Sequence, residues 1–384
     1  MDETLLAPGP ADAPGPPPVR GIFDEPVAAA EPTEPQRLVF TGRYGEYFRI
    51  WLVNLALSII TLGFYSPWAK VRRLEYFWRN TRLDGASFDY HGAPVAILKG
   101  RIIGLMLFAA YSLTAKAGVF FHLGAILAIA CVMPLLLHGT LRFRLHNTSY
   151  RGIRFRFTGE LRDAYTAFLG WPVLTVLSLF TLGPLAHQRM KSYEHRFATF
   201  GRTEFSEDIK PGPFYGAYLV VFFGTIGAFM AVGMAVAMIG MASGIAAKGA
   251  TTPGAPPIPP PAFVAVLLAV ILGAYLVAIL GSQAFLNSRI TNAVWNATRL
   301  GGHRFVSKVK ARRLLWLTFS NVFATVATLG LFTPVAQVRN ARYIIGAFSV
   351  LPGASFDDVQ AAEPDLVGAL GEEASGLFDF DISF

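Results

Sequence analysis

The sequence predicts an all-α integral membrane protein: a four-span helical bundle carrying three repeated broken-helix units and short cytoplasmic β-hairpins. Three observations lead to this fold class. Only 15% of the 384 residues are charged, against about 25% in soluble domains. Four apolar runs are long enough to cross a membrane. A Thr-Leu-Gly motif recurs three times beside basic stretches. With 53% hydrophobic residues and a mean hydropathy of +0.45, the chain is too apolar to be wholly soluble.

The four apolar runs form two helical hairpins. The first hairpin covers residues 102–115 and 118–137 and carries only Lys116 between its runs. The second covers residues 214–247 and 262–286, on either side of a Pro-rich loop. A spanning helix needs roughly 17–25 apolar residues, so each hairpin predicts two spans. Cys131, the only cysteine, lies within a span, so no intramolecular disulfide is expected.

The Thr-Leu-Gly motif opens a longer repeat. "TLGFYSPWAKVRRLEYF" begins at residue 61 and "TLGLFTPVAQVRNARYI" at residue 328, and the two align without gaps. A further copy begins at residue 181 and aligns after a three-residue deletion behind Gly183. In each copy an apolar segment breaks near a glycine and a proline, and a basic helix follows. We therefore expect a re-entrant or interfacial unit, which dips into the membrane and returns along its surface.

A second pattern predicts the short cytoplasmic hairpins. "NTRLDGASF", "NTSYRGIRF" and "ATRLGGHRF" share a threonine, a glycine four residues later and a phenylalanine three residues after that. Glycine permits the positive φ of a tight turn, and the alternation that follows it is typical of a strand. The structural residues of these turns are Thr81, Gly85, Phe88, Thr148, Gly152, Phe155, Thr298, Gly302 and Phe305.

These patterns divide the chain into seven parts. They are a disordered, acidic and Pro-rich leader (1–36), repeat unit 1 (37–92), transmembrane hairpin 1 (93–140), repeat unit 2 (141–211), transmembrane hairpin 2 (212–287), repeat unit 3 (288–347) and an acidic cytoplasmic tail (348–384). The leader lacks the basic and apolar regions of a signal peptide. Alternation in residues 376–384 predicts a strand that joins the cytoplasmic layer, with a disordered end as the alternative.

Charge determines the expected orientation. With four spans, both termini are cytoplasmic and the external loops hold only Lys116 and Lys248, as the positive-inside rule requires. If the Thr-Leu-Gly segments also crossed, seven transmembrane helices would result. The basic residues of segments 184–212 and 287–310 would then lie outside. The four-span arrangement is favoured, and seven transmembrane helices remain the alternative.

Long motifs resemble a known family. The segments "GEYFRIWLVNLALSIITLGFYSPWAKVRRLEYFWRNTRLDGASFDYHG" and "LRFRLHNTSYRGIRFRFTG" are similar to the YjgN-like family of bacterial inner-membrane proteins, and the resemblance extends over residues 38–346. It implies a multi-pass protein of the bacterial inner (cytoplasmic) membrane. It implies no biochemical activity.

The repeats supply the candidate contact residues. Arginine and tyrosine recur four residues apart on the basic helices, so each pair shares one helix face. Such pairs could hold anionic lipid or solute, although snorkelling arginines and packed tyrosines would give the same pattern. The pairs are Arg72 and Tyr76, Arg189 and Tyr193, and Arg339 and Tyr343.

Two amides form a second candidate set. Asn54 and Asn321 lie inside apolar segments, where an amide is costly unless it is paired. They either line a polar cavity or cap the freed carbonyls of their own broken helices.

No catalytic, cofactor-binding or metal-ligating residue is predicted. The chain has no HExxH or nucleotide-binding motif, and the four spans contain no carboxylate for proton coupling. The sequence therefore favours a non-enzymatic envelope or membrane-organising protein with a basic cytoplasmic layer. Its expected partners are anionic headgroups on the cytoplasmic face and another membrane protein, with no nucleic acid. A transporter or channel for a small or anionic solute is the alternative, and a lipid-modifying enzyme is a weaker one.

Overall fold

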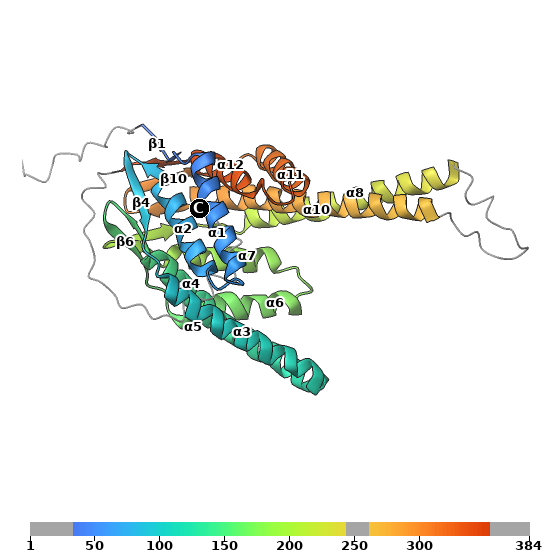
Figure 1. Cartoon of the computed structure of the whole chain (residues 1–384), viewed down its shortest axis with the longest axis horizontal. Coiled ribbons are helices and arrows are strands. Elements are labelled where there is room, and N and C mark those ends of the chain that lie inside the picture. Colours follow the sequence, from blue (N-terminus) through green and yellow to red (C-terminus); the bar gives the residue numbers. More distant parts are fainter. Residues whose placement is uncertain (1–33, 243–260, 354–384) are drawn as a thin grey trace, which may run out of the picture.

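A closed antiparallel sheet forms the base of the molecule. The computed structural model describes residues 34–242 and 261–353, and within them eleven short strands follow the order β1-β11-β10-β9-β8-β7-β6-β5-β4-β3-β2 (Figure 1). β1 (Gln36–Arg37) and β2 (Val39–Phe40) flank Leu38, whose N–H donates to the carbonyl oxygen of Phe348 at 3.1 Å. The two edges of the sheet are thus one continuous segment, and the sheet closes into a barrel.

Five hairpin-like pairs of strands make up this barrel. The last pair joins β11 (Phe348–Leu351) to the N-terminal segment that holds β1 and β2. The other four pairs each join a three-residue strand to a five-residue strand through a tight turn. They are β3 (Thr81–Leu83) with β4 (Ala86–Tyr90), β5 (Thr148–Tyr150) with β6 (Ile153–Phe157), β7 (Ala198–Phe200) with β8 (Thr203–Glu207), and β9 (Thr298–Leu300) with β10 (His303–Ser307).

A pair of antiparallel helices connects each strand pair to the next. Two helical pairs are long: α3 (Pro94–Ala117) with α4 (Val119–His146), and α8 (Gly212–Ala242) with α10 (Pro261–Asn296). Three are short. They are α1 (Tyr44–Ile60) with α2 (Ser66–Arg79); α5 (Leu161–Tyr165), the π-helical turn η1 (Thr166–Gly170) and α6 (Trp171–Leu177) with α7 (Gly183–Arg196); and α11 (Ala311–Ala327) with α12 (Thr333–Gly346).

All helical pairs leave the barrel at one rim. Because neighbouring strands are antiparallel, the four β-turns gather at the opposite rim. Figure 1 shows this polarity, with the strands at one end of the molecule and the helices extending away from them. The β-turn rim also holds Gln36 and Leu351, the outer ends of the first and last strands. Every helical pair therefore starts and finishes on the same side of the barrel.

The barrel interior is filled by large apolar side chains. Phe88 pairs in register with Tyr150, and Phe155 pairs with Phe200. The equivalent pairs in the next two units are Phe205 with Leu300 and Phe305 with Val350. The fully buried members of this cluster are Leu83, Phe88, Tyr150, Phe200, Leu300 and Val350. Burial of aromatic and branched side chains is the main source of stability for such a core.

The predicted all-α class is wrong, and so is its seven-helix alternative. Strands of three to five residues carry too little periodicity to predict a sheet, and their partners lie far away in the sequence. The seven-helix topology fails because residues 198–207 and 298–307 belong to the same sheet as residues 81–90, which places them on one side of any membrane.

Four helices in the described ranges are long and apolar enough to cross a membrane. They are Pro94–Thr114, Val119–His146, Gly212–Met238 and Val264–Asn296, and at most 11% of the most apolar window of each is buried. These helices do not form the expected four-helix bundle. The two long pairs diverge in Figure 1, and each packs against short helices, α2 and α5 for one and α7 and α11 for the other.

Several predicted segments lie outside the described residues. They are most of the leader (1–33), the Pro-rich loop after α8 (243–260) and the tail beyond residue 353, including the predicted strand at 376–384.

Candidate functional site

An arginine recurs at one position of the five helices that return to the barrel. We call α2, α4, α7, α10 and α12 the returning helices. In each returning helix we take the residue nine positions before the first residue of the strand that follows. In chain order these residues are Arg72, Gly139, Arg189, Arg289 and Arg339. Because the barrel has the same register in all five units, these residues stand at one level around it. We call the four arginines, which are Arg72, Arg189, Arg289 and Arg339, the arginine ring.

Each arginine of the ring lies over an aromatic side chain. The guanidinium carbon of Arg189 is 5.4 Å from the ring centroid of Trp171, and that of Arg289 is 5.4 Å from Phe285. Arg72 lies 5.8 Å from Tyr65, and Arg339 lies 5.8 Å from Phe332. Three of the four are exposed, and Arg339 is half-buried. Stacking on an aromatic face holds a guanidinium in place and leaves its edge N–H groups available to donate. Arg339 uses part of this edge inside the protein, since its Nη1 donates to Asn321 Oδ1 and its Nη2 to Ser320 Oγ.

The two predicted amides lie beside this ring and reach the returning helix. Nδ2 of Asn54 is 3.5 Å from the carbonyl oxygen of Ala69, and Nδ2 of Asn321 is 3.4 Å from that of Ala336. They therefore link the two helices of a pair instead of capping their own helix. Arg339 Nη1 also donates to Asn321 Oδ1 at 2.8 Å, whereas within the described residues Asn54 Oδ1 accepts no hydrogen bond.

Each of the three predicted tyrosines joins the two helices of a short pair by hydrogen bonds. Tyr76 accepts the backbone N–H of Arg43 at 2.8 Å and donates to its carbonyl at 2.9 Å. Tyr343 makes the same two bonds to Lys310, at 2.8 and 3.1 Å. In each case the partner stands 33 residues earlier, at the start of the preceding helix. The hydroxyl groups of Tyr76 and Tyr343 are therefore occupied by hydrogen bonds within their own helical pairs. Burial raises the pKa of Tyr76.

Tyr193 makes the corresponding contact in the middle unit. Its hydroxyl donates to the carbonyl of Glu160, again 33 residues earlier, at 3.2 Å. It also lies 2.8 Å from His138 Nδ1 on α4. Burial raises the pKa of Tyr193, and Asp163 adds to the rise.

The common spacing of 33 residues between each tyrosine and its backbone partner corrects the alignment of the second Thr-Leu-Gly copy. The left-handed turn of that unit is formed by Leu179 and Phe180, with φ of 53° and 66°, which match Leu62 and Gly63 at 50° and 89°. The unit therefore aligns without a deletion. The segment that corresponds to Thr61–Gly63 is Ser178–Phe180, three residues before the Thr-Leu-Gly copy at 181–183. Trp171, which stacks on Arg189, stands at the position of Asn54.

The predicted turn residues build the barrel. Thr81, Thr148 and Thr298 are buried, and each donates its hydroxyl to the carbonyl four residues earlier in the preceding helix. Gly85 and Gly152 adopt φ of 75° and 78°. In the last turn the left-handed residue is Gly301, with φ of 53°, and Gly302 instead lies close to the backbone of Gly353. Phe88, Phe155 and Phe305 face the barrel core.

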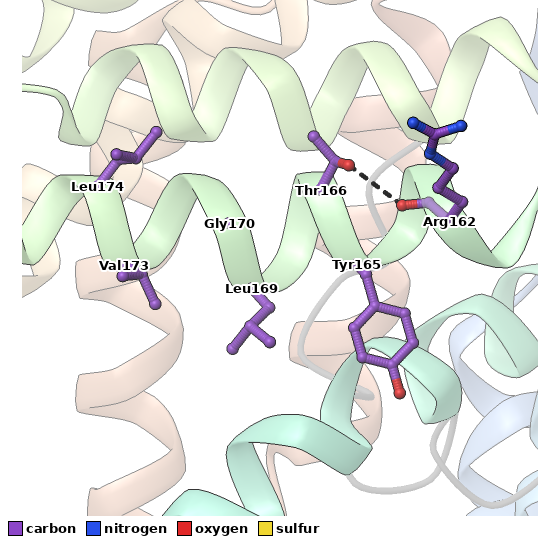
Figure 2. Close-up of a pocket in the computed structure, with 7 residues that line it drawn as sticks. All are labelled: Arg162, Tyr165, Thr166, Leu169, Gly170, Val173 and Leu174. Atoms are coloured by element: carbon purple, nitrogen blue, oxygen red, sulfur yellow. Dashed lines mark hydrogen bonds between the residues drawn. The ribbon is translucent and has the colours of Figure 1, made fainter.

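A shallow groove runs along α5, η1 and α6. It begins at Arg162 and Thr166 and ends at Val173 and Leu174, with Leu169 between them (Figure 2). Thr166 donates its hydroxyl to the backbone carbonyl of Arg162 at 3.1 Å. A groove with a cation at the barrel end and an apolar floor has the polarity of a phospholipid.

Sequence reasoning missed one arginine of the ring. Arg289 lies in a long helix without the Thr-Leu-Gly motif, so that motif does not reach it. It does stand nine residues before Thr298, as Arg72 stands nine residues before Thr81. Counting back from the recurrent threonine would have found it.

Helical pairs extend from one rim of a closed barrel, and four of these helices are long and apolar enough to span a bilayer. This architecture defines a membrane protein with a β-barrel base. The chain belongs to the family described as bacterial protein of unknown function (DUF898), whose model matches residues 35–377. The expected YjgN-like membership is confirmed by relatives named inner membrane protein YjgN. The Salmonella typhimurium protein is 33% identical over 149 residues, which are 37% of this chain and 36% of that protein.

A second relative agrees with this assignment. The YjgN protein of Escherichia coli O157:H7 is 27% identical over 146 residues, which are 38% of this chain and 36% of that protein. The match thus spans just over a third of the length of these curated relatives. No solved structure gives a significant match to the chain.

Proposed function

We propose that this protein is a non-enzymatic, membrane-organising protein of the bacterial inner membrane, and that its arginine ring binds anionic headgroups of the cytoplasmic leaflet. The observation that carries the proposal is the ring itself: four guanidinium groups at one level, each over an aromatic side chain. Each Lys or Arg near an anionic surface contributes roughly 1 kcal/mol of membrane affinity. Four at one level around the barrel would retain a shell of anionic lipid.

Two further features support a scaffold over a conduit. Aromatic and branched side chains fill the barrel interior, and a packed core offers a solute no path along the barrel axis. The groove of α5, η1 and α6 is shallow and open, with Arg162 at one end and apolar side chains along it, so it can accept a lipid (Figure 2).

The charge distribution supports a cytoplasmic barrel with both termini in the cytoplasm. The rims and strands of the barrel carry many arginines, whereas the far ends of the long helical pairs carry only Lys116, in the last turn of α3, and Lys248, in the segment after α8. Single cysteines at Glu204 and Arg299, both exposed, and at position 254, outside the described residues, test this in a Cys131→Ser background. We expect an impermeant maleimide to label only position 254 from the outside. External labelling of the strand cysteines would reverse the orientation.

Native mass spectrometry of the protein taken from mixed phosphatidylglycerol and phosphatidylcholine tests the headgroup proposal. The variant replaces Arg72, Arg189, Arg289 and Arg339 together by Gln. The matched control replaces four exposed arginines of the strands, Arg37, Arg82, Arg299 and Arg304, by Gln, which removes the same charge. We expect the ring variant to retain at least tenfold less phosphatidylglycerol, and the control to retain the wild-type amount. Equal retention by both variants would overturn the proposal, and a solute flux through reconstituted protein would favour the transporter alternative.

A further inference from the structure

The helical pairs reach different depths below the arginine ring. From Arg72 to the turn at Gly63 is nine residues, or about 13 Å of helix. From Gly139, the ring position of α4, to Val119 is twenty residues, or about 30 Å. The hydrocarbon core of a bilayer is about 30 Å thick. With the ring at the headgroups, the long pairs cross and the short pairs end near the middle of the bilayer.

The turns of the short pairs carry leucine where backbone geometry disfavours it. Leu62, Leu179 and Leu329 adopt φ of 50°, 53° and 50°, and are 96%, 84% and 95% exposed. A left-handed conformation costs an L-residue roughly 1–2 kcal/mol, and glycine or asparagine would relieve it. A strained leucine at the most exposed point of each turn is favourable only where the surroundings are apolar. The occupant of this surface is therefore lipid acyl chain.

The two leaflets then hold unequal amounts of protein. On the barrel side, both helices of all five pairs displace lipid, whereas on the far side, among the helices that the structure describes, only α3, α4, α8 and α10 do so. A helix with its side chains is about 10 Å across, so the extra helices widen the molecule substantially in one leaflet. Figure 1 shows the same taper, with α8 and α10 extending well past α6 and α11.

We infer that the protein is a wedge that accumulates where the membrane is convex toward the barrel side. Insertion into one leaflet is the general basis of curvature-dependent binding. The inference deepens the proposed membrane-organising role and rests on it only for the level at which the ring sits. It does not require anionic lipid.

Single-vesicle fluorescence tests this with labelled protein reconstituted into zwitterionic vesicles of mixed diameter. Only vesicles with the barrel outside, identified by protease access, are counted. We expect a several-fold higher protein density per membrane area on the smallest vesicles than on the largest. A density independent of diameter would overturn the inference.

Two variants identify the cause. Replacing Leu62, Leu179 and Leu329 together by Asn keeps the left-handed turn, because asparagine tolerates it, but makes the turns polar. This variant should unfold at a temperature no lower than the wild type and lose the dependence on diameter; unchanged sorting would contradict the wedge. The arginine-ring variant should sort like the wild type even though its headgroup binding is lost. Loss of sorting in that variant, with the leucines intact, would assign the effect to charge and overturn the inference.

Discussion

Arg339 Nη1 donates a 2.8 Å hydrogen bond to Asn321 Oδ1, while the equivalent oxygen of Asn54 accepts none within the described residues. Each asparagine places its Nδ2 about 3.5 Å from the carbonyl of the residue fifteen positions later, although Asn54 is buried and Asn321 is half-buried. The chain thus contains a natural comparison between a helical pair with the arginine bond and one without it.

We expect Asn321→Ala to destabilise the protein more than Asn54→Ala. A hydrogen bond to a charged group contributes about 1.5–3 kcal/mol, so the two free energies of unfolding should differ by about that amount. Chemical unfolding in detergent micelles measures both. Equal losses would show that the Arg339 bond contributes nothing to the α11 and α12 pair.

The tyrosine contacts predict a similar loss in two separate units. Tyr76→Phe and Tyr343→Phe each remove two hydrogen bonds to the backbone at the start of the preceding helix. Each should lower the free energy of unfolding by about 1–2 kcal/mol. Tyr275→Phe, at a residue that is 51% exposed on α10, is the control and should be neutral. A loss as large at Tyr275 as at the two contacts would contradict this assignment.

Glycine substitutions should have opposite signs at two nearby positions. Gly63 has φ of 89° with open space around it, so Gly63→Ala meets only backbone strain and should cost about 1 kcal/mol. Gly45 also has open space but lies in the first turn of helix α1, where alanine is favoured by up to about 1 kcal/mol. Thermal unfolding of the two variants therefore should move in opposite directions, and a stabilising Gly63→Ala would refute the left-handed turn.

Acidification should weaken the junction between α7 and the barrel. His195 lies against Trp295, with ring centroids 4.9 Å apart, and its Nδ1 is 3.4 Å from the hydroxyl of Thr298. Burial lowers the pKa of His195 to about 4 against the opposing pull of Glu194, and Lys191 and Arg144 lower it further. The folded state therefore keeps this imidazole neutral, while the unfolded chain takes up a proton below its ordinary pKa of about 6.5.

The sign of the effect follows from this difference. Between about pH 6.5 and pH 4 the unfolded state binds more protons, so stability falls as the pH falls, by at most about 2 kcal/mol between pH 7 and pH 5. Glu194 has a lowered pKa, because Lys191 and Arg144 outweigh the effect of burial, and it contributes only below about pH 4.5. Unfolding of a His195→Gln variant should have a smaller slope between pH 5 and pH 7, and His303, whose pKa is also lowered by burial, contributes part of the slope that remains. A slope unchanged in that variant would assign the pH dependence to another group.

The sequence by itself determined the features that depend on short stretches of chain. Apolar length revealed the two long helical pairs, because lipid requires about twenty consecutive apolar residues. The recurrence of Thr81, Gly85 and Phe88 at two other places revealed a repeated turn. The family resemblance rests on the same segments, because long motifs can be recognised in the sequence alone.

Only the tertiary structure decided that these turns close one barrel. β-strands of three to five residues are stabilised by partners up to hundreds of positions away, as Gln36 is by Val350, and no local pattern encodes such a pairing. The same long-range register shows that Arg289 belongs with Arg72 and that Phe180 occupies the place of Gly63. It also places Phe88 and its equivalents in the barrel core, and it brings the hydroxyl of Tyr76 to a backbone partner within its own helical pair. Local chemistry could suggest what each side chain is able to do, but the choice between a lipid contact and an internal bond depends on which distant segment lies beside it.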